Sequence, residues 1–144
     1  MGARFVENTH YTQMKKYIAT LFLNLITFIA IGQSNRFRID YDAIAILDQK
    51  TDTWSEWKAG NNTFVFNINN NKDVTHYKPN GSVAHYRNLS NDTQHGVTDN
   101  GYKYQLITIL DEDGIKCTLQ LFEDVRMGLK LIYSNVMIQF AKSD

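Results

Sequence analysis

Histidines are the side chains in this sequence best suited to chemistry near neutral pH, because an imidazole can exchange a proton or ligate a metal there. His76 and His85 lie in two strand-like runs that flank Pro79-Asn80-Gly81. If Asn80-Gly81 forms a two-residue turn, His76 lies opposite His85, and the two rings supply half of a zinc site. This register is the first of two alternatives.

The proline favours the second register. Proline suits the second position of a type I turn, and Gly81 then takes the left-handed position of a bulged loop. The pairs predicted by this register are His76 with Ala84 and, on the opposite side of the sheet, His85 with Thr75. We therefore predict that the two histidines are dispersed and that the chain has no metal site.

Aromatic side chains are the next candidates, because they offer flat apolar surfaces to a ligand. Trp54-Ser55-Glu56-Trp57 could stack on a sugar or gate a ligand; alternatively, the two tryptophans plug one end of the core. In the favoured register His76 and Tyr86 share one face of the sheet. The residues that we expect to line a ligand site are Trp54, Trp57, His76 and Tyr86.

Catalytic motifs are not recognisable in the sequence. Serines and histidines gather in or near residues 73–95, but not at the spacing of a known catalytic group. Residues 111–114, Asp-Glu-Asp-Gly, lack the spacing of a calcium loop and are interpreted as a solvated turn. We predict no catalytic residue and no cofactor.

The cysteine content bears on redox chemistry. Cys117 is the only cysteine, so no disulfide can form within the chain. It shares the apolar parity of its run with Ile115 and Leu119, which predicts a buried, inert thiol rather than a nucleophile.

The elements that position these residues are predicted to be antiparallel strands. Apolar runs at 102–110 and 115–122 are joined by a turn containing Asp113-Gly114, which favours a hairpin. Connections this short exclude parallel crossovers, which need about a dozen residues. Further strands are predicted at 129–133 and 136–140.

The first half of the domain shows the same alternation. Residues 36–47 alternate up to Tyr41 and then lose their polar face, which indicates either a bulge or a strand that becomes covered on both sides. Further strands are predicted at 63–69, 73–78 and 82–89. The polar segments 48–62 and 90–100 are interpreted as a turn-rich connection and a long surface loop.

About eight strands at roughly ten-residue spacing indicate an all-β fold, a single antiparallel meander forming a small barrel or a sandwich. In strand count and meander order the chain resembles up-and-down barrels of the lipocalin or avidin kind, in organisation only, and no functional residue follows from that resemblance. An eight-stranded barrel is just wide enough for its own side chains or one small ligand, so we expect a filled interior.

The N-terminal segment has the three parts of a secretory signal peptide. Met14-Lys15-Lys16 is basic, residues 17–31 are mostly apolar, and Ala30 and Gly32 fit a cleavage site before Gln33. The alternatives are a buried helix or a membrane anchor, but a helix of this length would reach only about 22 Å of the roughly 30 Å hydrocarbon core. We predict an upstream extension at 1–13, with Met14 as the true start, a signal peptide at 14–32 and one β domain at 33–144.

The charge of that domain bears on its partners. Residues 33–144 hold 12 Lys and Arg against 14 Asp and Glu, a net charge of −2 that argues against nucleic acid. We expect a secreted or periplasmic, non-catalytic binding module for a small apolar or aromatic ligand, without a membrane span after cleavage. A structural or protein-interaction domain with a filled core is the alternative, and a small hydrolase the third hypothesis. A cavity of at least about 300 Å³ favours the first.

Overall fold

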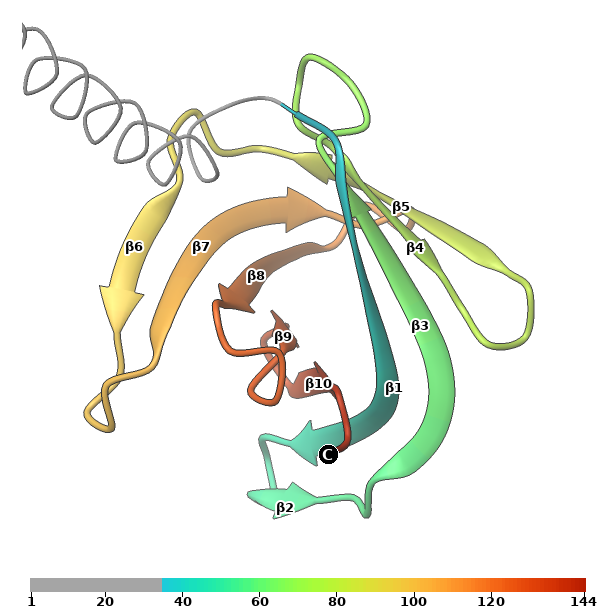
Figure 1. Cartoon of the computed structure of the whole chain (residues 1–144), viewed down its shortest axis with the longest axis vertical. Helices are drawn as coiled ribbons and strands as arrows, with labels where there is room; N and C mark the ends of the chain where they lie inside the picture. Colours follow the sequence, from blue (N-terminus) through green and yellow to red (C-terminus); the bar gives the residue numbers. More distant parts are fainter. Residues whose placement is uncertain (1–34) are drawn as a thin grey trace, which may run out of the picture. The chain divides into compact units, whose positions relative to one another are not determined.

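Ten strands follow one another in residues 35–144, the part of the chain that the computed structural model describes (Figure 1). Their bounds are β1 Phe37–Asp48, β2 Thr53–Trp54, β3 Lys58–Phe66, β4 Val74–Tyr77, β5 Val83–Asn88, β6 Gln94–Val97, β7 Lys103–Leu110, β8 Lys116–Phe122, β9 Leu129–Ile132 and β10 Val136–Ala141. The predicted upstream extension 1–13 and signal peptide 14–32 lie outside the described residues. None of the described residues belongs to a helix long and apolar enough to cross a membrane.

Eight of these strands close a barrel. Their order is β10-β9-β8-β7-β5-β4-β3-β1, and β1 pairs in turn with β10. The two extra strands lie beside this circuit, β2 on β1 and β6 on β7. All pairings are antiparallel, so the predicted all-β meander is confirmed, and it is a barrel rather than a sandwich.

The long strand β1 closes the barrel because it changes partner along its length. Its first part pairs with β3, and from Ala43 onward it also pairs with β10. The β1–β3 register shifts between Tyr41 and Ala43, which agrees with the bulge, one of the two predicted alternatives. Figure 1 shows β1 and β3 curving together around one side of the barrel. The segment of β1 that loses its polar alternation in the sequence, from Ala43 onward, is thus the segment that pairs with the additional strand β10.

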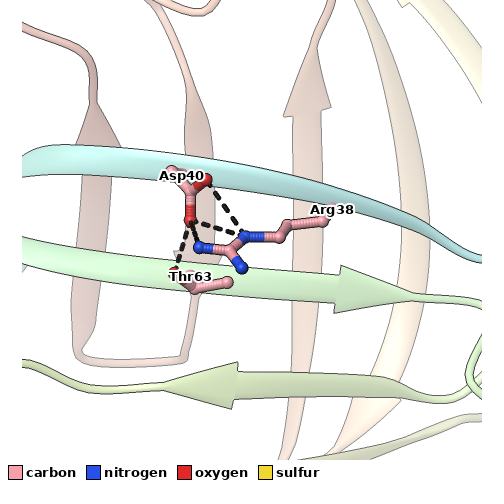
Figure 2. Close-up of polar contacts among 3 residues, drawn as sticks. All are labelled: Arg38, Asp40 and Thr63. Carbon is pink, nitrogen blue, oxygen red and sulfur yellow. Dashed lines mark hydrogen bonds and ion pairs between the residues drawn. The ribbon is translucent and has the colours of Figure 1, made fainter.

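The outer surface of β1 and β3 carries an ion pair near the start of β1. Figure 2 shows the Arg38 guanidinium against the Asp40 carboxylate, with Nη2 2.8 Å from Oδ1, while the Thr63 hydroxyl donates to the same carboxylate. These contacts hold the pKa of Asp40 below its usual range. Both charged side chains are well exposed, and exposed pairs of this kind contribute little to stability. The alternation therefore orients the strand, apolar inward and charged outward.

Inward-facing side chains from the barrel strands form one apolar core. The buried members are Tyr41, Phe64, Phe66, Val74, Ala84, Tyr86, Ile109, Cys117, Leu119, Leu129, Leu131 and Phe140. Cys117 is buried, as its parity predicts, and burial raises the pKa of its thiol to about 11. The interior is not filled throughout, however, and the expectation of a filled interior is wrong at one end of the barrel.

The two predicted hairpins are confirmed in detail. In β4–β5, His76 pairs with Ala84 and His85 with Thr75, which is the register that Pro79 favoured. Gly81 has a φ of 83°, the left-handed conformation expected of the bulge residue. The β7–β8 hairpin likewise closes on a left-handed glycine after its acidic turn.

Two predictions about the connecting segments are wrong. The expected loop 90–100 contains β6, which pairs Gln94 with Leu106 and Val97 with Lys103 of β7. In the described chain β5 covers the β7 edge through two residue pairs, so the rest of that edge is free for β6. Strand β3 begins at Lys58 rather than residue 63, because its small and polar first residues continue the ladder with β1.

Candidate ligand-binding cavity

A cavity of about 550 Å³ occupies one end of the barrel. Strands β1, β4, β7 and β9 all run toward this end, which is bordered by the β4–β5 turn and the β7–β8 turn. We call it the hollow end. Its lining is Ile44, Ala59, Gly60, Asn62, His76, Lys78, Pro79, Asn80, Ala84, Tyr86, Asp111, Glu112, Asp113, Leu131, Tyr133, Ile138 and Phe140.

His76 is the most deeply buried titratable side chain in this lining. It is 4% exposed, and its ring stacks on Phe64 with centroids 4.1 Å apart and meets the edge of Phe140 at 5.1 Å. Its Nε2 lies 2.8 Å from Asn62 Oδ1. The ring is therefore held on three sides, and its orientation is well defined.

The hydrogen bonds around His76 determine its tautomer. The Asn62 amide nitrogen donates to the Gly60 carbonyl at 3.1 Å, so the Asn62 oxygen is the atom that faces the ring. That oxygen accepts, so Nε2 carries the proton and Nδ1 is a bare acceptor. Nδ1 is buried and has no hydrogen-bond partner within residues 35–144.

Burial also keeps His76 neutral. Desolvation, assisted by the nearby charge of Lys78, lowers the pKa of His76 from 6.5 to about 4. At neutral pH Nδ1 of His76 is thus an unpartnered acceptor that is buried away from solvent. An unmet buried acceptor costs free energy.

The β7–β8 side of the cavity carries a tyrosine and a carboxylate. Tyr133 Oη donates to Asp111 Oδ2 at 3.4 Å, and burial raises the pKa of Tyr133 well above its usual range. Asp111 Oδ1 is occupied by the backbone N–H groups of Asp113 and Ile115 at 3.0 and 2.8 Å. Asp111 therefore shapes the turn with one oxygen and faces Tyr133 with the other.

The barrel wall is interrupted beside this turn. Strands β5 and β7 pair through Arg87 with Leu110 and Asn88 with Ile109, so the tip of the β4–β5 hairpin, which projects in Figure 1, extends past the paired region. Glu112 spans the interruption, since the His85 backbone N–H donates to its Oε1 at 3.1 Å. The Glu112 side chain thus supplies a hydrogen bond where β5 and β7 have no backbone pairing.

Two of the four predicted ligand residues come together in the cavity. His76 and Tyr86 both line it, and burial raises the pKa of Tyr86 to about 12. Trp54 and Trp57 are 44% and 53% exposed and do not belong to its lining. Trp54 pairs with Leu47, whose parity on β1 is opposite to that of the cavity residue Ile44. With these exposures the tryptophans do not plug the core either.

The sequence reasoning missed several lining residues. Asn62 lies in the segment interpreted as a turn, although it shares the parity of Phe64. Tyr133 shares the parity of Leu129 and Leu131. This alternation could have predicted that the Tyr133 side chain faces the interior. The acidic turn at Asp111 was interpreted as a solvated turn, and Glu112 and Asp113 are indeed exposed.

The structure also bears on metal binding. His85 lies on the outer side of the sheet, with Nδ1 3.3 Å from Thr75 Oγ1, and it does not approach His76. Across residues 35–144 no group of three or more His, Cys, Asp or Glu side chains is placed to hold a metal ion.

Comparison with protein-family models, with curated proteins and with solved structures finds no match to this chain.

Proposed function

We propose that this chain is a non-catalytic binding module whose barrel holds one small, largely apolar or aromatic molecule. The observation that carries this proposal is the cavity at the hollow end. Ligand cavities generally combine an apolar lining with a few fixed polar groups.

The size and composition of the cavity support the proposal. Its volume of about 550 Å³ lies within the 300–1,000 Å³ typical of small-molecule sites. Leu131, Ile138 and Phe140 supply apolar surface. The polar side chains of the lining include Asn62 and Lys78. The cavity favours binding over the structural alternative, since that alternative assumes a filled core.

The lining gives little support to a hydrolase. Within the described chain no serine or cysteine lines the cavity, and the Nε2 of His76 is engaged by Asn62 rather than by a nucleophile. Export is part of the proposal and rests on the predicted signal peptide at 14–32, so the site of action would be the periplasm or the exterior.

A matched pair of variants on one strand tests the proposal. Ala84 is 6% exposed and lines the cavity, while Val83 is its neighbour on the opposite face and 38% exposed. A tryptophan at position 84 fills the cavity, and a tryptophan at position 83 leaves it empty. The neutral, largely apolar fluorophore 1-aminoanthracene serves as the probe.

We expect the probe to bind the parent protein and Val83→Trp equally, and Ala84→Trp at least about tenfold more weakly, a loss of about 1.4 kcal/mol. Circular dichroism checks that both variants fold. Equal binding by a folded Ala84→Trp protein would place the probe elsewhere and overturn the proposal. Mass spectrometry of a solvent extract of the natively purified protein would then identify any natural ligand.

A further inference from the structure

Most polar groups buried in the cavity wall already have partners within the wall. Asn62 bonds to His76 and to the Gly60 carbonyl, and the Tyr133 hydroxyl donates to Asp111. Asp111 accepts from Tyr133 with one oxygen and from the backbone of its own turn with the other. These groups hold the wall together, so they have little left to offer a ligand.

Tyr86 is the exception. Its side chain is 6% exposed, lines the cavity and shares the inward face of β5 with Ala84. Its hydroxyl makes no hydrogen bond to another group of residues 35–144. A buried tyrosine hydroxyl usually has a hydrogen-bond partner, so this one lacks a partner that it would normally have.

The Tyr86 hydroxyl can also be reached. Two buried side-chain atoms of the described residues lack a partner and are sealed from solvent, His76 Nδ1 and Tyr41 Oη. Tyr86 Oη is not one of these sealed atoms, and because its side chain points into the barrel, the space that reaches it is the cavity. A placed polar group in an apolar wall is what orients a ligand in such a site.

The Tyr86 hydroxyl offers a proton. Burial, assisted by the nearby Cys117, Asp111 and Glu112, raises the pKa of Tyr86 to about 12, so the hydroxyl keeps its proton at neutral pH. A phenol donates a hydrogen bond well, whereas its oxygen accepts one weakly because a lone pair is delocalised into the ring. The two carboxylates also disfavour an anion beside this hydroxyl.

From these observations we infer that the ligand carries a neutral acceptor oxygen, such as that of a ketone, ester or amide carbonyl, which accepts a hydrogen bond from Tyr86. This inference rests on the proposed binding function and adds the polar group of the ligand. The apolar body of the ligand lies against Leu131, Ile138 and Phe140. Tyr86 then discriminates against a hydrocarbon of the same shape, which would leave the hydroxyl unpaired.

Three naphthalene probes with one body and different heads test the inference. 2-Acetylnaphthalene carries a carbonyl, 2-isopropenylnaphthalene has a methylene group in place of that oxygen, and 2-naphthoate is an anion. Displacement of 1-aminoanthracene gives each dissociation constant. We expect the ketone to bind more tightly than 2-naphthoate. The ketone and the hydrocarbon differ in hydration, so their dissociation constants are compared as a ratio between protein variants.

Tyr86→Phe removes the hydroxyl and keeps the ring. Relative to the hydrocarbon, the ketone should bind this variant at least about fivefold more weakly than it binds the parent protein, which is the effect of one neutral hydrogen bond. Tyr77→Phe is the matched control, because Tyr77 is 48% exposed and lies on the opposite face of the β4–β5 hairpin from His76 and Ala84. This control should change neither affinity.

Infrared spectroscopy of the ketone, isotopically labelled at its carbonyl, gives a second readout that needs no variant. A hydrogen bond from Tyr86 weakens the carbonyl bond. The carbonyl stretch of the ketone bound to the parent protein should therefore lie at lower frequency than in hexane, and Tyr86→Phe should return it toward the hexane value.

The outcomes separate this inference from the proposed function. If 1-aminoanthracene binds in the cavity but the ketone does not displace it, the inference is wrong and the binding function stands. The same conclusion follows if the affinity ratio is unchanged in Tyr86→Phe, if 2-naphthoate binds as tightly as the ketone, or if the carbonyl stretch in the parent protein equals the hexane value. If 1-aminoanthracene itself does not bind, the proposed function fails and the inference fails with it.

Discussion

The two ends of the barrel differ in how tightly their turns pack. At the closed end the β8–β9 connection contains Gly128, with a φ of 71°, and a Cβ built there would lie 1.8 Å from the Phe140 carbonyl oxygen. At the hollow end Gly81 and Gly114 have similar φ values of 83° and 76°, yet such a Cβ would meet no atom of the described chain within 4 Å. The same backbone conformation is thus buried at one end and free at the other.

This difference explains how a small barrel keeps a cavity. Val74 and Leu129, which begin β4 and β9 at the closed end, are fully buried. The Phe140 side chain belongs both to the core and to the cavity lining, so it marks where dense packing stops. We infer that the closed end provides stability and that the hollow end is left for binding.

The largest expected effect is on the closed end. Gly128→Ala should lower the free energy of unfolding by about 3 kcal/mol or more, because backbone strain at positive φ adds to a clash with a backbone oxygen that cannot move aside. Urea unfolding monitored by tryptophan fluorescence measures it. A loss no greater than that of Gly81→Ala would contradict the packing difference.

The next effect belongs to His76 and depends on pH. The pKa of His76 is about 4 in the folded chain against 6.5 ordinarily, so between these pH values the unfolded chain binds a proton that the folded chain does not. Stability should fall as the pH drops from 6.5 to 4, by about 3 kcal/mol at most, at about 1.4 kcal/mol per pH unit.

Urea unfolding at several pH values measures this slope, with His76→Gln as the variant that cannot titrate there. Its stability should depend less on pH between 4 and 6.5 than that of the parent protein. The exposed His95, replaced by glutamine, is the control and should preserve the slope. A parent-like slope in His76→Gln would mean that this imidazole is not buried in its neutral form.

Cys117→Ser should cost about 1–3 kcal/mol, because it buries a hydroxyl among apolar side chains. The raised thiol pKa of about 11 also predicts slow alkylation of the native protein at pH 8 and fast alkylation in urea. Rapid modification of the folded protein by a bulky thiol reagent would show instead that this part of the core is open.

The smallest effect is expected at the hollow end. Gly81→Ala should cost about 1 kcal/mol, the cost of a left-handed alanine without a steric clash. Matched urea curves for this variant and Gly128→Ala measure the two ends on one scale. A Gly81→Ala protein that loses several kcal/mol of unfolding free energy would show that this turn is tightly packed. The packing of the two ends would then differ less than we infer.

Local sequence rules predicted much of this fold and less of the cavity. The β4–β5 register follows from Pro79 and Gly81, whose backbone preferences act within five residues. The closure of β1 on β10 pairs Ala43 with Ala141, and no local rule reaches that far. Strand β6 was not predicted because its sequence is polar. It forms a strand because it pairs with the free edge of β7.

Only the cavity residues of the β4–β5 hairpin were predicted from the sequence. His76 and Tyr86 share a face because of a register that turn chemistry determines. Asn62 and Tyr133 reach the same space from β3 and the end of β9, and their convergence depends on barrel closure. The tryptophans were chosen for residue type alone, and type does not say which way a side chain faces.

The most direct test of the account is a titration of the ¹⁵N-labelled protein with 1-aminoanthracene, followed by nuclear magnetic resonance. The account predicts that saturable amide shifts gather around His76, Ala84 and Tyr133 at the hollow end, and that Gly128 and Val74 at the closed end do not move. Shifts confined to the exposed segment around Trp54 and Trp57, or the absence of any saturable shift, would contradict the claim that the hollow end is a binding site.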